Sequence, residues 1–164
     1  QKLLKLFRVQ FVATTNDPTE DLKDHGKINE TDVTPTFRPD KLYNFDSKYI
    51  EELSKVVGYP LNDLDSFQKA LEERLDFFKS KGCKITDHGF RSFPKAYATY
   101  EQAKSLYLKR DSLTSEEKDS LFGYLLVFLM KEYKKRGLLM QIHFSVIRNI
   151  NTPMYKKLGV DMGF

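Results

Sequence analysis

The sequence predicts an α/β fold in which parallel strands are joined by crossover helices. Three hydrophobic stretches, at residues 8–14, 84–88 and 138–144, are rich in the β-branched and aromatic residues typical of strands. Segments with helical periodicity separate them, and strands joined in this way are normally parallel. Because three parallel strands alone leave two unprotected edges, we expect them to form a partial segment of a (β/α)8 TIM barrel.

The composition indicates a soluble protein of one domain. The chain has 164 residues, of which 40% are hydrophobic and 30% charged. No apolar run approaches the ~20 residues that cross a bilayer. The densest basic run, 131–136, ends a predicted helix, where cations offset the helix dipole. We therefore expect no membrane or nucleic-acid partner, and the single Cys83 suits a small core residue in the reducing cytoplasm.

The first 35 residues predict a helix end, a strand and a loop. Residues 1–7 have the spacing of the last turns of a helix, and residues 8–14 form the first strand. Pro18 ends the ladder, with Asp17 as a turn former. Residues 21–35 are polar, so we expect a loop with at most one helical turn and a solvent-exposed His25.

Residues 1–164 are interpreted as a single partial domain, in which residues about 45–82 form a helical insertion. Residues 145–164 predict a polar loop. Four helices are predicted from periodicity and capping residues. The helices, with their boundary signals, are 46–57 (Asp46 or Ser47, then Gly58), 63–80 (Asp63 or Asp65, then Lys81-Gly82), 100–109, and 114–136 (Thr114 with Glu117 as a capping box, then Gly137).

Acidic and imidazole side chains lie where two strands end. Asp87 and His88 close the second strand, which is how α/β enzymes present reactive groups. His88 has three functional readings, as metal ligand, partner of a ligand or general acid–base, against a structural histidine with hydrogen bonds. His143 shares one face of the last strand with Gln141, because side chains alternate. No Cys/His spacing matches a structural zinc site.

Two arginines are candidates for binding an anion. Arg38 lies between Phe37 and Pro39, so it is presented stiffly, as a bidentate grip on a carboxylate requires. Arg148 has two readings, an anion ligand or a helix cap.

Five stretches, in the same order and at similar spacing, resemble the uronate isomerases (glucuronate isomerase). They are 13–18 (ATTNDP), 34–41 (TPTFRPDK), 86–89 (TDHG), 140–149 (MQIHF leading into Arg148-Asn149) and 158–164 (LGVDMGF). The resemblance implies a distorted TIM barrel of the amidohydrolase superfamily. It implies the interconversion of D-glucuronate with D-fructuronate, and of D-galacturonate with D-tagaturonate.

The resemblance also implies a divalent metal, usually zinc. The family's main ligands are a His-x-His pair and a late aspartate, and this sequence has neither. We therefore expect the central segment of a longer protein, inactive alone and homo-oligomeric in its full-length form.

Under the resemblance, Arg38 matches the family's carboxylate-gripping arginine, although Phe37 replaces a tryptophan. Asn16 stands where the family commonly has aspartate. His88 and His143 are the candidate catalytic residues, either one a candidate metal ligand. Together with Arg38 they should point toward a common site. The candidate substrate-binding residues are Arg38, Asp87 and Arg148.

Two alternatives remain open. One is a metal-dependent hydrolase of the same superfamily, although an uncommitted arginine would favour the isomerase. The other is a non-catalytic α/β binding module, complete as it stands. The module predicts no exposed apolar face, whereas a segment of a longer barrel predicts a large one.

Overall fold

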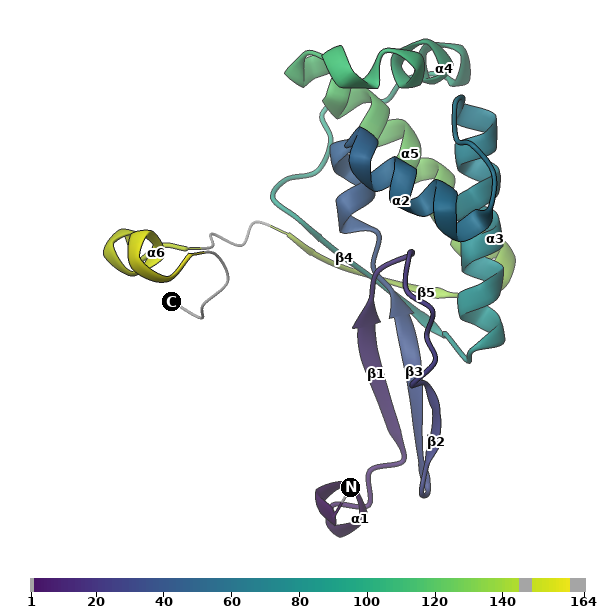
Figure 1. Ribbon diagram of the computed structural model, residues 1–164, viewed down its shortest axis with the longest axis vertical. Coiled ribbons are helices and arrows are strands. Elements are labelled where there is room, and N and C mark those ends of the chain that lie inside the picture. Colours follow the sequence, from purple (N-terminus) through teal and green to yellow (C-terminus); the bar gives the residue numbers. More distant parts are fainter. Residues whose placement is uncertain (1, 145–148, 160–164) are drawn as a thin grey trace.

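The computed structural model describes residues 2–144 and 149–159 (Figure 1). Helical and extended elements alternate along the chain. In order they are α1 (Lys2–Leu6), β1 (Phe11–Asn16), β2 (Gly26–Ile28), β3 (Thr31–Phe37), the 3-10 helix η1 (Asp40–Asn44), α2 (Ser47–Val57), α3 (Leu64–Ser80), β4 (Ile85–Phe90), α4 (Tyr100–Leu108), the 3-10 helix η2 (Arg110–Ser112), α5 (Ser115–Arg136), β5 (Leu139–Phe144) and α6 (Thr152–Leu158).

The strands form a sheet of order β1-β3-β4-β5, in which all these neighbours are parallel. β2 adds an antiparallel pairing to β3. Figure 1 shows α2, α3, α4 and α5 gathered on one side, while β1, β2 and β3 project away from them as a ribbon that ends near α1. The predicted α/β architecture with crossover helices is therefore confirmed.

Two strands, β2 and β3, lie where the sequence does not predict any. The predicted loop over 21–35 is wrong, because β2 and most of β3 lie in it. Asn29 adopts a left-handed φ of 56° between the paired residues Ile28 and Thr31, so the two strands form a tight hairpin. The sequence of β3 concealed the strand, because its three threonines, Asp32 and Pro35 leave no apolar alternation, although four of its seven residues are buried.

Pro35 sits inside β3 without disrupting the sheet. The N–H groups of Asp32 and Arg38 donate to carbonyls before and at the end of β1, so the even-numbered residues of β3 face β1. Pro35 therefore faces the other edge. At that edge, β2 pairs with β3 only as far as Val33, and β4 pairs with β3 at Phe37. The missing N–H of proline falls in the gap between them, where it leaves no ladder bond unmade.

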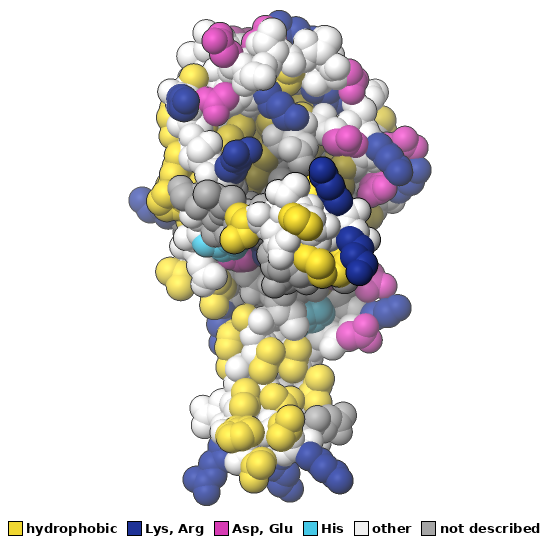
Figure 2. Space-filling view, turned by 90° about the vertical axis from the view of Figure 1, so that its left-hand side faces the viewer, with side chains coloured by type: hydrophobic (Ala, Val, Ile, Leu, Met, Phe, Trp, Pro, Cys, Tyr) yellow, Lys and Arg dark blue, Asp and Glu magenta, His cyan; other side chains and the backbone are white. Residues whose placement is uncertain are grey.

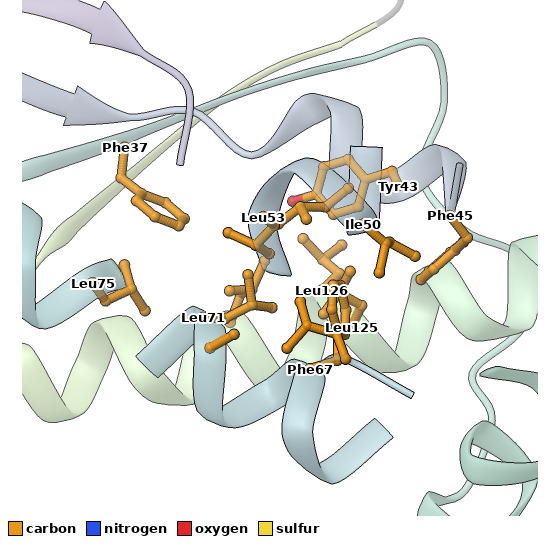
Figure 3. Packing of buried hydrophobic residues seen from close by; sticks show 14 of the residues in the cluster. Phe37, Tyr43, Phe45, Ile50, Leu53, Phe67, Leu71, Leu75, Leu125 and Leu126 are labelled. Atoms are coloured by element: carbon orange, nitrogen blue, oxygen red, sulfur yellow. The ribbon is translucent and has the colours of Figure 1, made fainter. Parts of the chain in front are cut away.

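Buried side chains from β3, α2, α3 and α5 point toward one another in a single core (Figure 3). Each large apolar residue buried there stabilises the fold by about 1.5–3 kcal/mol. The predicted helix signals are confirmed: Asp46 and Asp63 cap α2 and α3, Thr114 and Glu117 form the capping box of α5, and Gly137 ends it. Cys83 is buried, as predicted.

Large apolar side chains are also exposed. In α1 and just after it, Leu3, Leu6 and Phe7 are 67–72% exposed, and Leu139 in β5 is 66% exposed. Figure 2 shows hydrophobic side chains gathered over the narrow end formed by α1 and the ribbon. This exposure contradicts the binding-module prediction and agrees with that for a segment of a larger fold.

The prediction of a polar loop after β5 is wrong for residues 152–158, which form α6. Its N-cap Asn151 accepts from the backbone N–H of Met154, and Pro153 lies in its first turn. None of the described helices combines the length and apolar character needed to cross a bilayer.

Candidate functional site

Three charged or polar side chains meet toward the carboxyl ends of β3, β4 and β5. Arg38 follows β3, and its Nη1 lies 3.3 Å from Oδ2 of Asp87 in β4. Nε2 of His143 in β5 lies 3.2 Å from Oδ1 of the same carboxylate. Asp87 itself is only 6% exposed, whereas the side chains of Arg38 and His143 are 26% and 38% exposed, so both partners reach the buried carboxylate from the solvent side. The expected convergence of Arg38 and His143 is confirmed.

Strand register explains why these groups meet. Asp87 pairs with Gln141, and Gly89 pairs with His143, so the side chains of Asp87, Gln141 and His143 project from one face of the sheet, where a side chain at Gly89 would also lie. The Gln141 side-chain amide donates to Oδ1 of Asp87 at 3.2 Å. The shared face that the sequence predicted for Gln141 and His143 is thus the face that carries Asp87.

His88 does not join this cluster, and the prediction that it points toward the same site is wrong. It is adjacent to Asp87, so its side chain leaves the opposite face of β4, where the helices pack. It is fully buried, with Nδ1 2.7 Å from the Tyr43 hydroxyl and Nε2 3.2 Å from Oγ1 of Thr86. Burial lowers its pKa to about 4, although neighbouring Asp87 raises it. His88 is therefore a neutral histidine of the packed layer.

A second polar cluster lies at the end of β1. Nε2 of His25 lies 2.7 Å from Oγ1 of Thr14 and 3.1 Å from Oδ1 of Asn16. Asn16 donates to Glu20 at 2.8 Å. The predicted exposure of His25 is wrong, because the polar stretch folds back over β1. In the sequence, the polar residues at the end of the first predicted strand are the feature that could have indicated the contacts of His25 with Thr14 and Asn16.

Asp17 organises the turn after β1, as predicted. Its Oδ1 accepts from the N–H and hydroxyl of Thr19. It also accepts the hydroxyl of Tyr49 in α2 at 2.6 Å, a contact that the sequence did not indicate.

The described residues do not form a metal centre. They contain no group of three or more His, Cys, Asp or Glu side chains arranged to hold an ion. Asp87 and His143 supply only two potential ligands, and these two side chains already contact each other. Arg148, the remaining candidate for substrate binding, lies outside the described residues.

Comparison with known proteins identifies the family. The profile described as glucuronate isomerase matches residues 1–164. The chain belongs to the glucuronate isomerase family. It is similar to uronate isomerases from Brachyspira hyodysenteriae and Halalkalibacterium halodurans, each 37% identical over 99% of the chain and 38% and 37% of the relative. The chain therefore spans less than two-fifths of the length of the curated relatives it matches.

Two solved structures of this family share the fold. The uronate isomerase from Thermotoga maritima matches with a TM-score of 0.89 at 27% identity, and the glucuronate isomerase from Caulobacter crescentus with 0.85 at 26%. Each match covers 98% of this chain and 38% and 36%, respectively, of the other chain. The predicted fold, a partial segment of a TIM barrel, is confirmed. The interpretation of residues 45–82 as an insertion stays a prediction.

Proposed function

We propose that this chain is part of a uronate isomerase that interconverts D-glucuronate with D-fructuronate, and D-galacturonate with D-tagaturonate. The observation that carries the proposal is the cluster of Arg38, Asp87 and His143, found at the carboxyl ends of parallel strands in a chain of this family. Catalytic groups of TIM barrels lie at these strand ends. The substrate is a small sugar acid with one carboxylate and a reacting C1–C2 pair.

The cluster contains the groups that such a reaction needs. Arg38 supplies a planar cation for the sugar carboxylate, which orients the substrate and fixes the distance to the reacting end. Aldose–ketose isomerisation moves a proton between C1 and C2 through an enediol. His143 carries a ring nitrogen that can accept a proton and return it, as general acid–base catalysis requires, and Asp87 fixes its ring through Nε2. Asp87 thereby serves orientation more than direct substrate binding.

A divalent metal, usually zinc, is proposed only for the longer protein. The described donor set does not fit a metal centre, so no step of the reaction is assigned to a metal here. We propose that the longer protein is a homo-oligomer and that this chain alone is inactive.

The structure removes one argument that separated this function from a hydrolase. Arg38 is not uncommitted, because Asp40 accepts from its Nε at 2.7 Å and Asp87 contacts Nη1. The isomerase is favoured by the family match instead. An activity screen must therefore include lactones and amides beside the uronates.

The test uses a chimera in which this chain replaces the matching segment of the Brachyspira hyodysenteriae isomerase. The chain alone, with D-glucuronate and added zinc, should show no turnover. The folded chimera should form D-fructuronate, and His143→Ala should lower kcat by about two to four orders of magnitude. A cooperatively folded chimera that acts only on lactones or amides would overturn the proposal.

A further inference from the structure

Asp40 joins Arg38 to the neighbouring strand. Its Oδ2 accepts from Nε of Arg38 at 2.7 Å, and its Oδ1 accepts the backbone N–H of Gly89 at 2.9 Å. Hydrogen bonds between ionised partners at such distances are among the stronger ones in proteins. One carboxylate therefore ties the side chain that follows β3 to the backbone of β4.

The segment that carries Asp40 is itself restrained. The ring of Pro39 limits rotation about φ, which is −91° here. The N–H of Leu42 donates to the Pro39 carbonyl at 2.9 Å and closes the first turn of η1. Asp40 is the first residue of that turn, so this hydrogen bond and the proline ring restrain its backbone beside Arg38.

Gly89 provides the space in which Arg38 and His143 approach each other. A Cβ at this position would lie 2.5 Å from Cε1 of His143 and 2.6 Å from Nη2 of Arg38, closer than real side chains come. Gly89 is not among the glycines with positive φ, so its backbone conformation suits alanine. The obstacle to a larger residue is the site alone.

These contacts orient the guanidinium of Arg38. Its Nε is held by Asp40 at 2.7 Å, whereas its Nη1 lies at a longer 3.3 Å from Asp87. Within residues 2–144 and 149–159, none accepts a hydrogen bond from Nη2. The Nη edge therefore faces the space beside His143, and an arriving anion competes there only with the longer contact to Asp87.

We propose that Asp40 is a positioning residue that acts through Arg38, with Gly89 as the space that its placement requires. Asp40 fixes the Nε edge, so that the Nη edge is presented to the carboxylate of a sugar acid. The choice of ligand rests on the proposed function, but the fixed orientation of Arg38 does not. The two parts can therefore fail separately.

The orientation is tested on this chain by NMR of the arginine Nε–H groups. Asp40→Asn leaves one oxygen where two are used, so the Arg38 Nε–H should exchange with water at least about tenfold faster. Nε of Arg74, bound to the Pro18 carbonyl, and Nε of Arg136, bound to Asp76, serve as internal references and should change less than about twofold. An unchanged Arg38 signal beside intact references would overturn the proposal.

Two further variants separate positioning from folding. Asp46→Asn makes the same chemical change at a helix cap, where asparagine serves as well, and it should leave Arg38 unaffected. Gly89→Ala should shift the Arg38 and His143 signals while the urea midpoint stays nearly constant. If Gly89→Ala lowers the urea midpoint as a core mutation does and leaves both signals in place, the site does not depend on this space.

The role toward the substrate is tested in the chimera. Asp40→Asn should raise KM for D-glucuronate about tenfold with kcat changed less than about threefold, and Asp40→Glu should restore part of the loss. A fall in kcat at constant KM would overturn this role. If the parent chimera has no uronate isomerase activity, the proposed function fails while the NMR result on Arg38 still stands.

Discussion

Asp87 and His88 are neighbours in β4, yet their surroundings differ in almost every respect. Asp87 faces the open side of the sheet and contacts side chains that follow or lie in two other strands. His88 is fully buried against the helices, between Tyr43 and Thr86. The open face carries groups that can meet a ligand, and the packed face carries a polar network that meets only protein. A histidine at a strand end must therefore be assigned to a face of the sheet before it is assigned a role.

The largest effect should come from removing the buried ring. His88→Ala leaves a cavity and removes the partners of Tyr43 and Thr86, so it should lower the free energy of unfolding by about 3 kcal/mol. Urea denaturation measures this loss. A loss below about 1 kcal/mol would show that the packed face does not depend on His88.

Acid should destabilise the chain through the same residue. The pKa of His88 is lowered to about 4 by burial, below the ordinary 6.5. The unfolded state therefore takes up the proton first, and stability present above pH 6.5 is lost as the pH falls toward 4. The loss should reach roughly 3 kcal/mol. Urea midpoints between pH 7 and 4 measure it, and His88→Gln should remove most of this dependence.

Removing one hydrogen bond of the network should have a smaller effect. Tyr43→Phe keeps the ring but leaves Nδ1 of His88 without its 2.7 Å partner. The expected destabilisation is about 1–2 kcal/mol. Tyr97→Phe, a change of the same kind at an exposed tyrosine, is the matched control and should have almost no effect.

The smallest effect on stability should come from the open face. The His143 side chain is 38% exposed and contacts Asp87 through one nitrogen, so His143→Ala should cost no more than about 0.5 kcal/mol. The main effect of His143→Ala should instead be a lower kcat in the chimera. A stability loss as large as that of His88→Ala would erase the distinction between the two faces.

Much of the fold was accessible from the sequence because its signals are local. The caps at Asp46 and Thr114 satisfy helix N–H groups with side chains one turn away, so they can be read without tertiary information. β3 was missed because its Thr31-Asp32-Val33-Thr34-Pro35 sequence lacks the apolar alternation that core packing produces. Its pairing depends on partners distant in the chain.

The site was half predictable for a similar reason. Alternation placed Gln141 and His143 on one face, and the same rule excludes a shared face for Asp87 and His88. Alternation does not decide whether Asp87 or His88 points to the open side of the sheet, because polar residues occupy both faces of this strand. Only the packing of α5 and η1 decides, through the rings of Tyr133 and Tyr43.

β3 and β4 are joined by a single register pair, Phe37 with Thr86, whereas β1 pairs with β3 along six residues. The projecting ribbon can therefore separate its strands without disturbing the helical layer. Its amide protons, such as that of Val12, should exchange with deuterium through such local opening, with a free energy well below that of complete unfolding. The amides around Thr86 should exchange only when the whole chain unfolds. The protein should then contain two regions of unequal persistence, which the sheet joins through one register pair.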